Sequence, residues 1–180
     1  MKYLISLLLI FIIGLNSCGS KSPKNDNNKN ELLKWYGKEI LLPKEMEIRS
    51  NLKVIKCPDL FSEKYKIIVY VDSNGCVPCR LVLFEWRELI KETKRLKIDV
   101  AFLFYISLNN YQIFEQEVLK NKFEYPVIYD RDDRINQLNH FPKNQQFHFF
   151  LLNSKNKVLL VGNPIGNLKL KQLYLQQISK

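Results

Sequence analysis

Hydrophobic residues in this chain gather in short continuous runs, and amphipathic stretches separate these runs. Continuous runs of strand-forming residues that end at turn residues are typical of strands covered on both faces. Three such runs occupy residues 66–72 (KIIVYVD), 99–107 (DVAFLFYIS) and 125–129 (YPVIY). Two further runs, at 146–152 and 157–161, flank the turn residues 153–156 and therefore predict an antiparallel hairpin.

The remaining segments contain the predicted helices, in which apolar residues recur at steps of three and four. These helices are expected at 78–94, 110–122 and 168–178, with one or two helical turns at 130–139 and an edge strand at 47–55. Strands that alternate with helices, followed by a hairpin and a helix, predict an α/β fold. We expect a central mixed sheet with helices on both faces.

The N-terminus has the form of a secretory signal. Met1 and Lys2 give a positive start, and the apolar run 3–15 is shorter than the ~20 residues that a membrane-spanning helix needs. Residues 15–18 (LNSC) also resemble the bacterial lipobox, and this resemblance implies that Cys18 becomes the lipidated first residue of the mature chain. An ordinary signal peptide with an incidental cysteine and an uncleaved anchor remain the alternatives.

Residues 19–30 (GSKSPKNDNNKN) contain no aliphatic or aromatic side chain, so they predict a flexible tether. The expected organisation is a signal peptide at 1–17, the lipidated cysteine and tether at 18–30, and one domain at 31–180. This places the domain outside the cytoplasm, in the periplasm, held on a bacterial membrane, inner or outer, through Cys18.

Composition narrows the class of protein further. A hydrophobic content of 46% in 180 residues excludes wholesale disorder, and four cysteines are too few for a disulfide-scaffold miniprotein. Removal of residues 1–17 takes away only Lys2, which changes the net charge from +10 to +9. Outside the cytoplasm such a protein meets anionic lipid headgroups, and the chain carries no recognisable nucleic-acid-binding motif, so no nucleic-acid partner is expected.

The candidate chemistry is concentrated at 76–79 (CVPC), between the strand at 66–72 and the helix that follows it. Cys79 belongs to the apolar face of that helix, whereas Cys76 lies at its mouth, where unpaired N–H groups and the helix dipole stabilise a thiolate. Pro78 suits a first helical turn, and Arg80 adds a positive charge nearby. The spacing predicts that Cys76 attacks a partner and that Cys79 resolves the mixed disulfide.

At these residues the sequence resembles the thioredoxin superfamily, and more closely its TlpA-like extracytoplasmic thiol-disulfide oxidoreductases. The resemblance rests on the 66–72 strand, the CxxC turn, the strand-helix-strand after it, the segment 125–130 and the final hairpin, and it covers roughly residue 37 to the end. It implies a thioredoxin-like fold, extracytoplasmic protein partners with cysteines or disulfides, and a reaction without a bound cofactor or metal.

The chain departs from the family pattern at several positions. Phe147 stands where these proteins carry a cis-proline before the first hairpin strand, and Pro142 lies five residues too early. Tyr70 replaces the carboxylate that thioredoxins place six residues before the first cysteine, and Gly75 replaces the usual aromatic residue. Asp72 is either a proton relay acting through water or a surface residue at a strand end.

No histidine lies between the two cysteines to stabilise the thiolate. A less stabilised thiolate gives a more reducing couple, so the expected role is that of a reductant or isomerase of protein disulfides. The alternative function is a non-catalytic binding lipoprotein of the cell envelope, in which the fold remains as a docking surface.

Other chemistries for the same residues stay open. Cys76 and Cys79 could form a structural disulfide, or they could bind zinc together with two of Cys57, His140 and His148. The two histidines have no motif around them, and Cys57 is an unassigned thiol.

A peroxiredoxin needs a proline seven residues and a threonine or serine three residues before its attacking cysteine. Ser73 matches this pattern for Cys76, but Val69 does not.

Overall fold

The structure is a computed structural model that describes residues 30–56, 58–74 and 81–179. The chain divides into one unit at Met1–Glu31 and a second at Leu32–Lys180, and the fold below is that of the second unit. Cys18, Cys57 and residues 75–80 lie outside the described residues. No helix in the described part is long and apolar enough to cross a bilayer.

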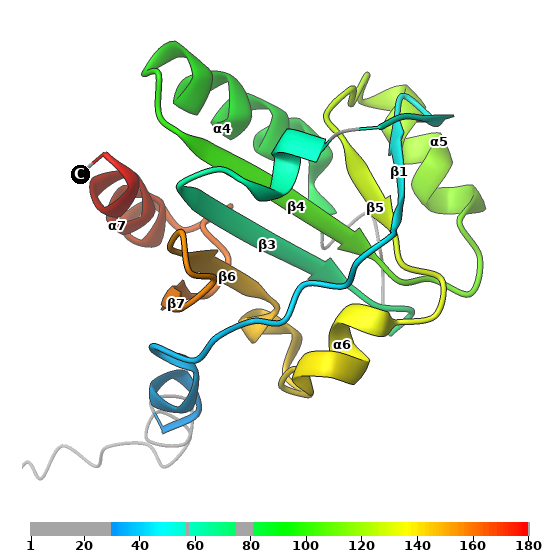
Figure 1. Cartoon of the computed structure of the whole chain (residues 1–180). Helices are drawn as coiled ribbons and strands as arrows, with labels where there is room; N and C mark the ends of the chain where they lie inside the picture. The colour runs from blue at the N-terminus through cyan, green and yellow to red at the C-terminus, as the bar shows by residue number, and fades with distance from the viewer. Residues whose placement is uncertain (1–29, 57, 75–80, 180) are drawn as a thin grey trace, which may run out of the picture. The chain divides into compact units, whose positions relative to one another are not determined.

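In the described part of this unit, seven strands form one mixed sheet in the order β2-β1-β5-β4-β3-β6-β7 (Figure 1). β3, β4 and β5 run parallel, β1 pairs antiparallel with β5, and β6 pairs antiparallel with β3. Their bounds are β1 Glu47–Ser50, β2 Lys53–Val54, β3 Tyr65–Val71, β4 Val100–Ile106, β5 Val127–Tyr129, β6 Phe149–Leu152 and β7 Val158–Val161.

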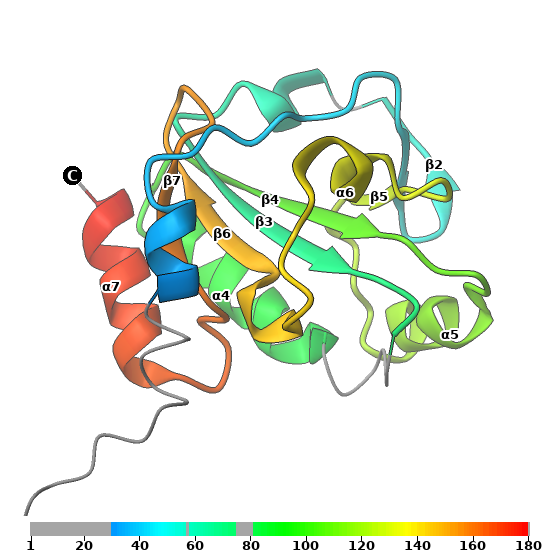
Figure 2. The ribbon, with the colours of Figure 1, turned by 90° about the horizontal axis from the view of Figure 1, so that it is seen from below.

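Helices cover both faces of the sheet, as Figure 2 shows for α4 and α5 on one side and α6 on the other. One face of the sheet packs against the apolar sides of α4, α5 and α7. The other face packs against η1, α6 and an N-terminal segment, residues 35–42, that precedes β1. Their bounds are η1 Pro58–Phe61, α4 Leu83–Arg95, α5 Gln112–Lys120, α6 Arg134–Asn139, η2 Gln145–Phe147 and α7 Leu168–Ile178. The predicted α/β class with a mixed sheet is therefore confirmed.

The interior strand β3, between β4 and β6, is buried along its whole length. Side chains at alternate positions of a strand point to opposite faces, so Val69 and Val71 enter the core under α4 while Ile68 and Tyr70 enter the core under α6. A strand with both faces covered reads as a continuous apolar run, which explains why the sequence alone located it.

Three segments differ from their predicted form. The helix expected at 78–94 is α4, which begins only at Leu83, because Val82 before it adopts a left-handed φ of 38°. The edge strand expected at 47–55 is a short hairpin of β1 and β2, because Asn51 and Leu52 adopt left-handed φ values of 45° and 65° and reverse the chain. The strand expected from 146 begins at Phe149, because residues 145–147 form the 3-10 turn η2. The side chain of Asn144 caps this turn by accepting a hydrogen bond from the backbone N–H of Gln146.

Two aspartates hold α6 against the end of the sheet. The buried carboxylate of Asp130 accepts hydrogen bonds from the backbone N–H groups of Arg134 (2.8 Å) and Ile135 (2.9 Å). Asp133 is therefore not needed as a cap, and its Oδ1 instead accepts a hydrogen bond of 2.7 Å from the hydroxyl of Tyr70. Tyr70 lies beside Tyr105 of β4 in the parallel register, and the buried Tyr105 hydroxyl has no hydrogen-bond partner in the described part of the chain.

Removal of the Tyr70 hydroxyl and removal of the Tyr105 hydroxyl should have different effects on the stability of the fold. We expect Tyr70→Phe to lower the free energy of unfolding by about 1.5 kcal/mol, because it takes a donor from the Asp133 carboxylate. Tyr105→Phe should be neutral or stabilising, since it removes a buried hydroxyl that has no described partner. Urea unfolding of the two variants beside the wild type measures both effects, and an equal loss for both would contradict the assignment.

The stability of the wild type should also depend on Asp130 in a defined pH range. Burial raises the pKa of Asp130 above its ordinary value of 3.8. As the pH rises through 3.8, the Asp130 carboxyl group loses its proton in the unfolded chain before it does so in the folded chain. The contribution of Asp130 to the free energy of unfolding therefore falls until the pH exceeds the pKa of Asp130 in the folded chain. Asp130→Asn cannot titrate, and it keeps one acceptor for the α6 N–H groups at a cost of about 1 kcal/mol.

The comparison between these two proteins isolates this single group. Urea unfolding from pH 3 to 7 should show the stability gap between wild type and Asp130→Asn narrowing as the pH rises. A gap that widens with rising pH would show that the carboxylate is favoured in its charged form.

Candidate functional site

The predicted exchange residues follow directly from the carboxyl end of β3. Cys76, Pro78, Cys79 and Arg80 all lie in the segment 75–80, outside the described residues. The described chain stops at Asn74 before this segment and continues at Leu81 after it. The described part of the site consists of the end of β3, the start of α4, and η2.

Residues 72–74, which lead into the cysteine segment, are held by hydrogen bonds from three directions. The Asp72 carboxylate accepts bonds from the backbone N–H (3.1 Å) and the side-chain amide (3.0 Å) of Asn74, which forms a local turn. The hydroxyl of Ser73 accepts a bond of 2.9 Å from the backbone N–H of Asn109. Gln145 of η2 donates to both the Asn74 carbonyl and the Asp72 carboxylate.

Asp72 is thus a partly exposed residue at a strand end with a structural task in this turn. A relay of protons from Asp72 through water to the cysteines stays a prediction. The sequence does not predict the contact from Gln145, because Gln145 and Asp72 are 73 positions apart and no local pattern indicates such a pair.

Tyr70, which stands in place of the family carboxylate, is a hydrogen-bond donor at this end of the sheet. Burial and the hydrogen bond to Asp133 raise the pKa of Tyr70 far above its usual range, so its hydroxyl keeps its proton. The nearest carboxylate to that hydroxyl comes from Asp133, which the sequence pattern did not identify. Asp133 has a left-handed φ of 54°, a strained conformation for a residue other than glycine.

The two histidines occupy different surroundings. His148 is buried beside Tyr70, with ring centroids 4.8 Å apart, and its Nε2 lies 2.7 Å from the carbonyl oxygen of Pro142. A carbonyl only accepts, so Nε2 carries the proton. His140 is exposed at the end of α6. Within residues 30–56, 58–74 and 81–179, no group of three or more His, Cys, Asp and Glu side chains could hold a metal ion.

A groove of about 570 Å³ opens beside the first turn of α4. Its apolar lining comes mainly from Phe147, Phe149, Val161, Ile165 and Leu170, and polar side chains of Glu85, Gln145, Gln146, Asn163 and Asn167 surround these. Val82, which precedes α4, also lines the groove, so the groove lies next to the helix end that continues the cysteine segment.

Phe147, at the position assigned to the family proline, is a buried residue of η2 and forms part of this groove. No cis peptide bond occurs in the described part of the chain. The backbone N–H groups of Phe147 and His148 donate to the carbonyls of Asn144 and Gln145. The turn therefore uses these N–H groups for its own hydrogen bonds.

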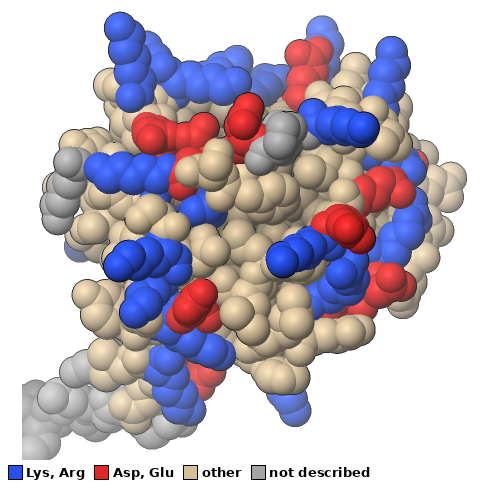
Figure 3. All heavy atoms as spheres, in the orientation of Figure 1, with Lys and Arg blue, Asp and Glu red and all other residues tan. Residues whose placement is uncertain are grey.

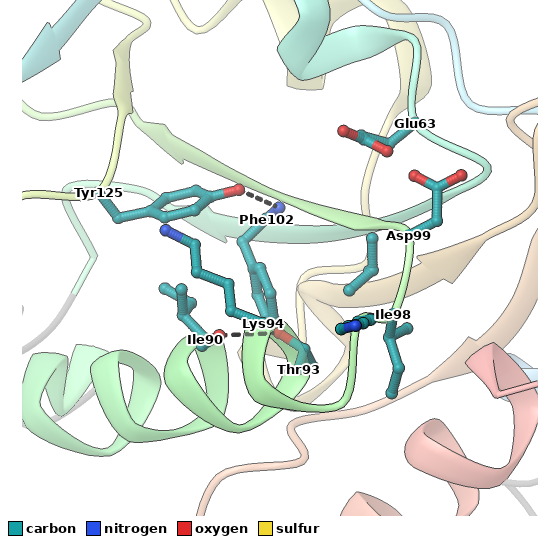
Figure 4. A pocket seen from close by; sticks show the side chains of 10 residues that line it. Glu63, Ile90, Thr93, Lys94, Ile98, Asp99, Phe102 and Tyr125 are labelled. Carbon is teal, nitrogen blue, oxygen red and sulfur yellow. Dashed lines mark hydrogen bonds between the residues drawn. The ribbon is translucent and has the colours of Figure 1, made fainter.

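A second pocket, of about 290 Å³, lies at the opposite end of the sheet, between the end of α4 and the start of β4 (Figure 4). The Tyr125 hydroxyl accepts a bond from the backbone N–H of Phe102, and the Thr93 hydroxyl donates to the Ile90 carbonyl. Both groups serve the packing of this end of the domain. The pocket carries charges of both signs, and it is remote from the carboxyl end of β3.

Basic side chains do not form one stripe on the face of the molecule drawn in Figure 3. Lys and Arg are spread over this face, with Asp and Glu between them. On this face, such a distribution is typical of a solvated surface.

Comparisons with known proteins support the fold. No protein-family model and no curated protein matches the sequence. Among solved structures, a putative thiol-disulfide oxidoreductase from Bacteroides vulgatus has a TM-score of 0.51 at 20% identity, covering 74% of this chain and 86% of its own. The thioredoxin domain of the thiol-disulfide oxidoreductase BVU-2223 from Bacteroides vulgatus has a TM-score of 0.51 at 14% identity, covering 77% of this chain and 97% of its own.

A peroxiredoxin structure has a slightly higher TM-score than these two oxidoreductases. The mitochondrial 2-Cys peroxiredoxin of Plasmodium falciparum has a TM-score of 0.55 at 15% identity, covering 78% of this chain and 92% of its own. These identities are low, so the likeness concerns the fold. The domain described here has the thioredoxin-like fold.

Proposed function

We propose that the protein is a thiol-disulfide oxidoreductase that acts through Cys76 as nucleophile and Cys79 as resolving thiol. The observation that carries this proposal is the place of the CxxC sequence in the fold. In the sequence it follows the carboxyl end of the buried strand β3 and precedes α4, and an apolar groove lies beside the start of α4. Structures of oxidoreductases with the same fold support the proposal.

The proposed reaction is a pair of thiol-disulfide exchanges. The Cys76 thiolate attacks one sulfur of a substrate disulfide, a Cys76–substrate bond forms, and the second substrate sulfur leaves as a thiolate that takes up a proton. Cys79 then loses its proton and attacks the Cys76 sulfur, which releases the substrate as a dithiol. The protein is left with a Cys76–Cys79 disulfide, and a second dithiol protein reduces it again.

The proposed protein reduces or isomerises disulfides, and it acts outside the cytoplasm. With Val77 and Pro78 between the cysteines, no histidine stabilises the thiolate, which favours a reductant or isomerase over a strong oxidant. The lipobox-like residues 15–18 favour a lipoprotein held on a bacterial membrane through Cys18, with the domain facing extracytoplasmic proteins. The exchange itself needs no bound cofactor.

A non-catalytic binding lipoprotein is the second candidate. The observations that favour it are Tyr70 in place of an acidic residue and Phe147 in place of the proline, because both positions border the exchange site in the family that the sequence resembles. In this alternative the groove beside α4 binds a partner and the cysteines remain paired.

Trapping of mixed disulfides separates the two candidates. We expect Cys79→Ser to accumulate covalent complexes through Cys76 in cells, because the variant lacks the thiol that completes the exchange. Non-reducing electrophoresis and mass spectrometry identify the complexes and their partners, and the Cys76→Ser, Cys79→Ser double variant is the control. An absence of complexes, together with wild-type protein that does not accelerate reduction of insulin by dithiothreitol, would contradict the enzyme.

Membrane attachment can be tested by one substitution. Acyl chains contribute about 0.8 kcal/mol per buried methylene, so loss of the lipidated sulfur should release the protein. We expect Cys18→Ser to move from the membrane fraction to the soluble fraction, or to accumulate with its signal segment uncleaved, and to lose labelling by radioactive palmitate. Wild-type protein that takes up no palmitate would show that Cys18 is not a lipidation site.

A further inference from the structure

The charged residues of this protein are distributed unevenly along the chain. Residues 134–180 contain seven Lys and Arg residues and no Asp or Glu, so they supply +7 of the formal net charge of +10. In the fold this stretch forms α6, η2, β6, β7 and α7, and β7 is an edge strand of the sheet. A stretch of this length with charges of one sign favours contact with a negatively charged partner.

α7 and the helical residues 32–35 both lie beside this edge strand (Figures 1 and 2). The Tyr174 hydroxyl of α7 donates a hydrogen bond of 2.9 Å to the carbonyl of Gly162, directly after β7. The N-terminal segment is held to the same strand, because the backbone N–H of Gly37 donates to the carbonyl of Val158 at 2.8 Å. Residues 32–38, 158–162 and 168–178 therefore form one surface, which we call the β7 face.

The β7 face exposes large apolar side chains. A groove of about 220 Å³ runs along β7 and is lined by apolar and aromatic side chains of residues 32, 33, 36 and 158–161. Contiguous apolar surface on a soluble domain marks a contact with another protein or with a membrane. The side chains on this face that are exposed by half or more are Leu33 (62%), Tyr36 (69%), Leu168 (71%) and Leu173 (50%).

Lysines border these apolar side chains, and acidic groups offset them only in part. Lys157 and Lys169 are exposed directly before β7 and in the first turn of α7. Residues 31–39 carry two acidic and two basic residues and add no net charge. Glu92 of α4 binds Lys171 of α7 at 2.6 Å, which neutralises one lysine. The β7 face keeps a positive excess around its apolar side chains, and this combination binds anionic lipid bilayers.

The N-terminal part of the chain leads to the same face. Residues 1–29 include the apolar run 3–15 and the lipobox-like residues 15–18, and the chain continues from them into the β7 face at Leu32. Fourteen residues separate Leu32 from Cys18, a span of at most about 50 Å when fully extended. An anchor at Cys18 would keep the β7 face within this distance of the bilayer. A lipid surface therefore fits this face better than a soluble partner does.

We propose that the β7 face is a membrane-contact surface, in which the lysines bind anionic lipid headgroups and the four exposed apolar side chains enter the boundary below them. This inference deepens the proposed membrane location, because it gives the folded domain a lipid contact of its own. It also sets the orientation of the domain. The β2 edge lies at the opposite end of the sheet and points away from the bilayer.

Sedimentation with vesicles measures the contribution of this face. All proteins are full chains that carry Cys18→Ser and are otherwise unchanged in residues 1–29, so that ratios of their partition coefficients report the domain. Over a titration with phosphatidylglycerol vesicles, we expect the pair Leu168→Ser, Leu173→Ser to bind about 10-fold more weakly. Lys169→Gln should bind roughly 5-fold more weakly. On phosphatidylcholine vesicles the effect of Lys169→Gln should disappear.

A matched control comes from α5, which packs elsewhere on the sheet. Ile113 and Leu119 are exposed by 60% and 55%, and neither belongs to the β7 face. The pair Ile113→Ser, Leu119→Ser should bind vesicles as the parent does, and urea unfolding checks that every variant is folded. An equal loss of binding for the two pairs, or binding that does not depend on the charge of the lipid, would overturn the inference.

Hydroxyl-radical labelling followed by mass spectrometry locates the contact in the same samples. Phosphatidylglycerol vesicles should protect the four exposed apolar side chains of the β7 face and leave the α5 pair labelled. Protection that arises without vesicles as the protein concentration rises would assign the face to a second copy of the chain and overturn the inference. Wild-type Cys18 without lipid would end the proposed lipoprotein, but the vesicle ratios, measured without lipidation, would still decide the role of the β7 face.

Discussion

The burial of β3 on both faces is the constraint on which the rest of the domain depends. All seven residues of this strand are buried, and it pairs with β4 on one side and with β6 on the other. Its alternate side chains join two separate cores, one under α4, α5 and α7 and one under the N-terminal segment and α6. Any shift of its register by one residue would exchange the two sets of side chains, so the position of the carboxyl end of β3 is fixed with the cores.

Polar contacts hold the carboxyl end of β3, where the apolar run stops. The turn of Asp72 and Asn74, the bond from Asn109 to Ser73, and the amide of Gln145 come from three parts of the chain and meet on residues 72–74. A few hydrogen bonds at the surface contribute little to total stability, but they select one path for the chain. The segment with the cysteines therefore starts from a defined point.

Tyr70 and Phe147 show how this domain differs from the pattern that its sequence resembles. Tyr70 keeps its proton because it is buried and donates to Asp133, so it cannot accept a proton from a resolving thiol. Under the proposed function, the base for Cys79 must be another group or solvent. Phe147 anchors a 3-10 turn whose N–H groups are already bonded within the turn, so a substrate in the groove would be recognised through side chains more than through backbone pairing with these groups.

The sequence by itself determined the elements whose residues carry local signals. The runs at 66–72 and 99–107 became β3 and β4, and the helix expected at 168–178 is α7 with the same bounds, because burial on both faces or on one face leaves a periodic pattern. The strand order, the start of β6 at Phe149, and the contacts of Asp133 and Gln145 were decided only by the tertiary structure. The bonds from Tyr70 to Asp133 and from Gln145 to Asn74 join residues 63 and 71 positions apart, and no local pattern records which distant residues the packing of two cores will bring together.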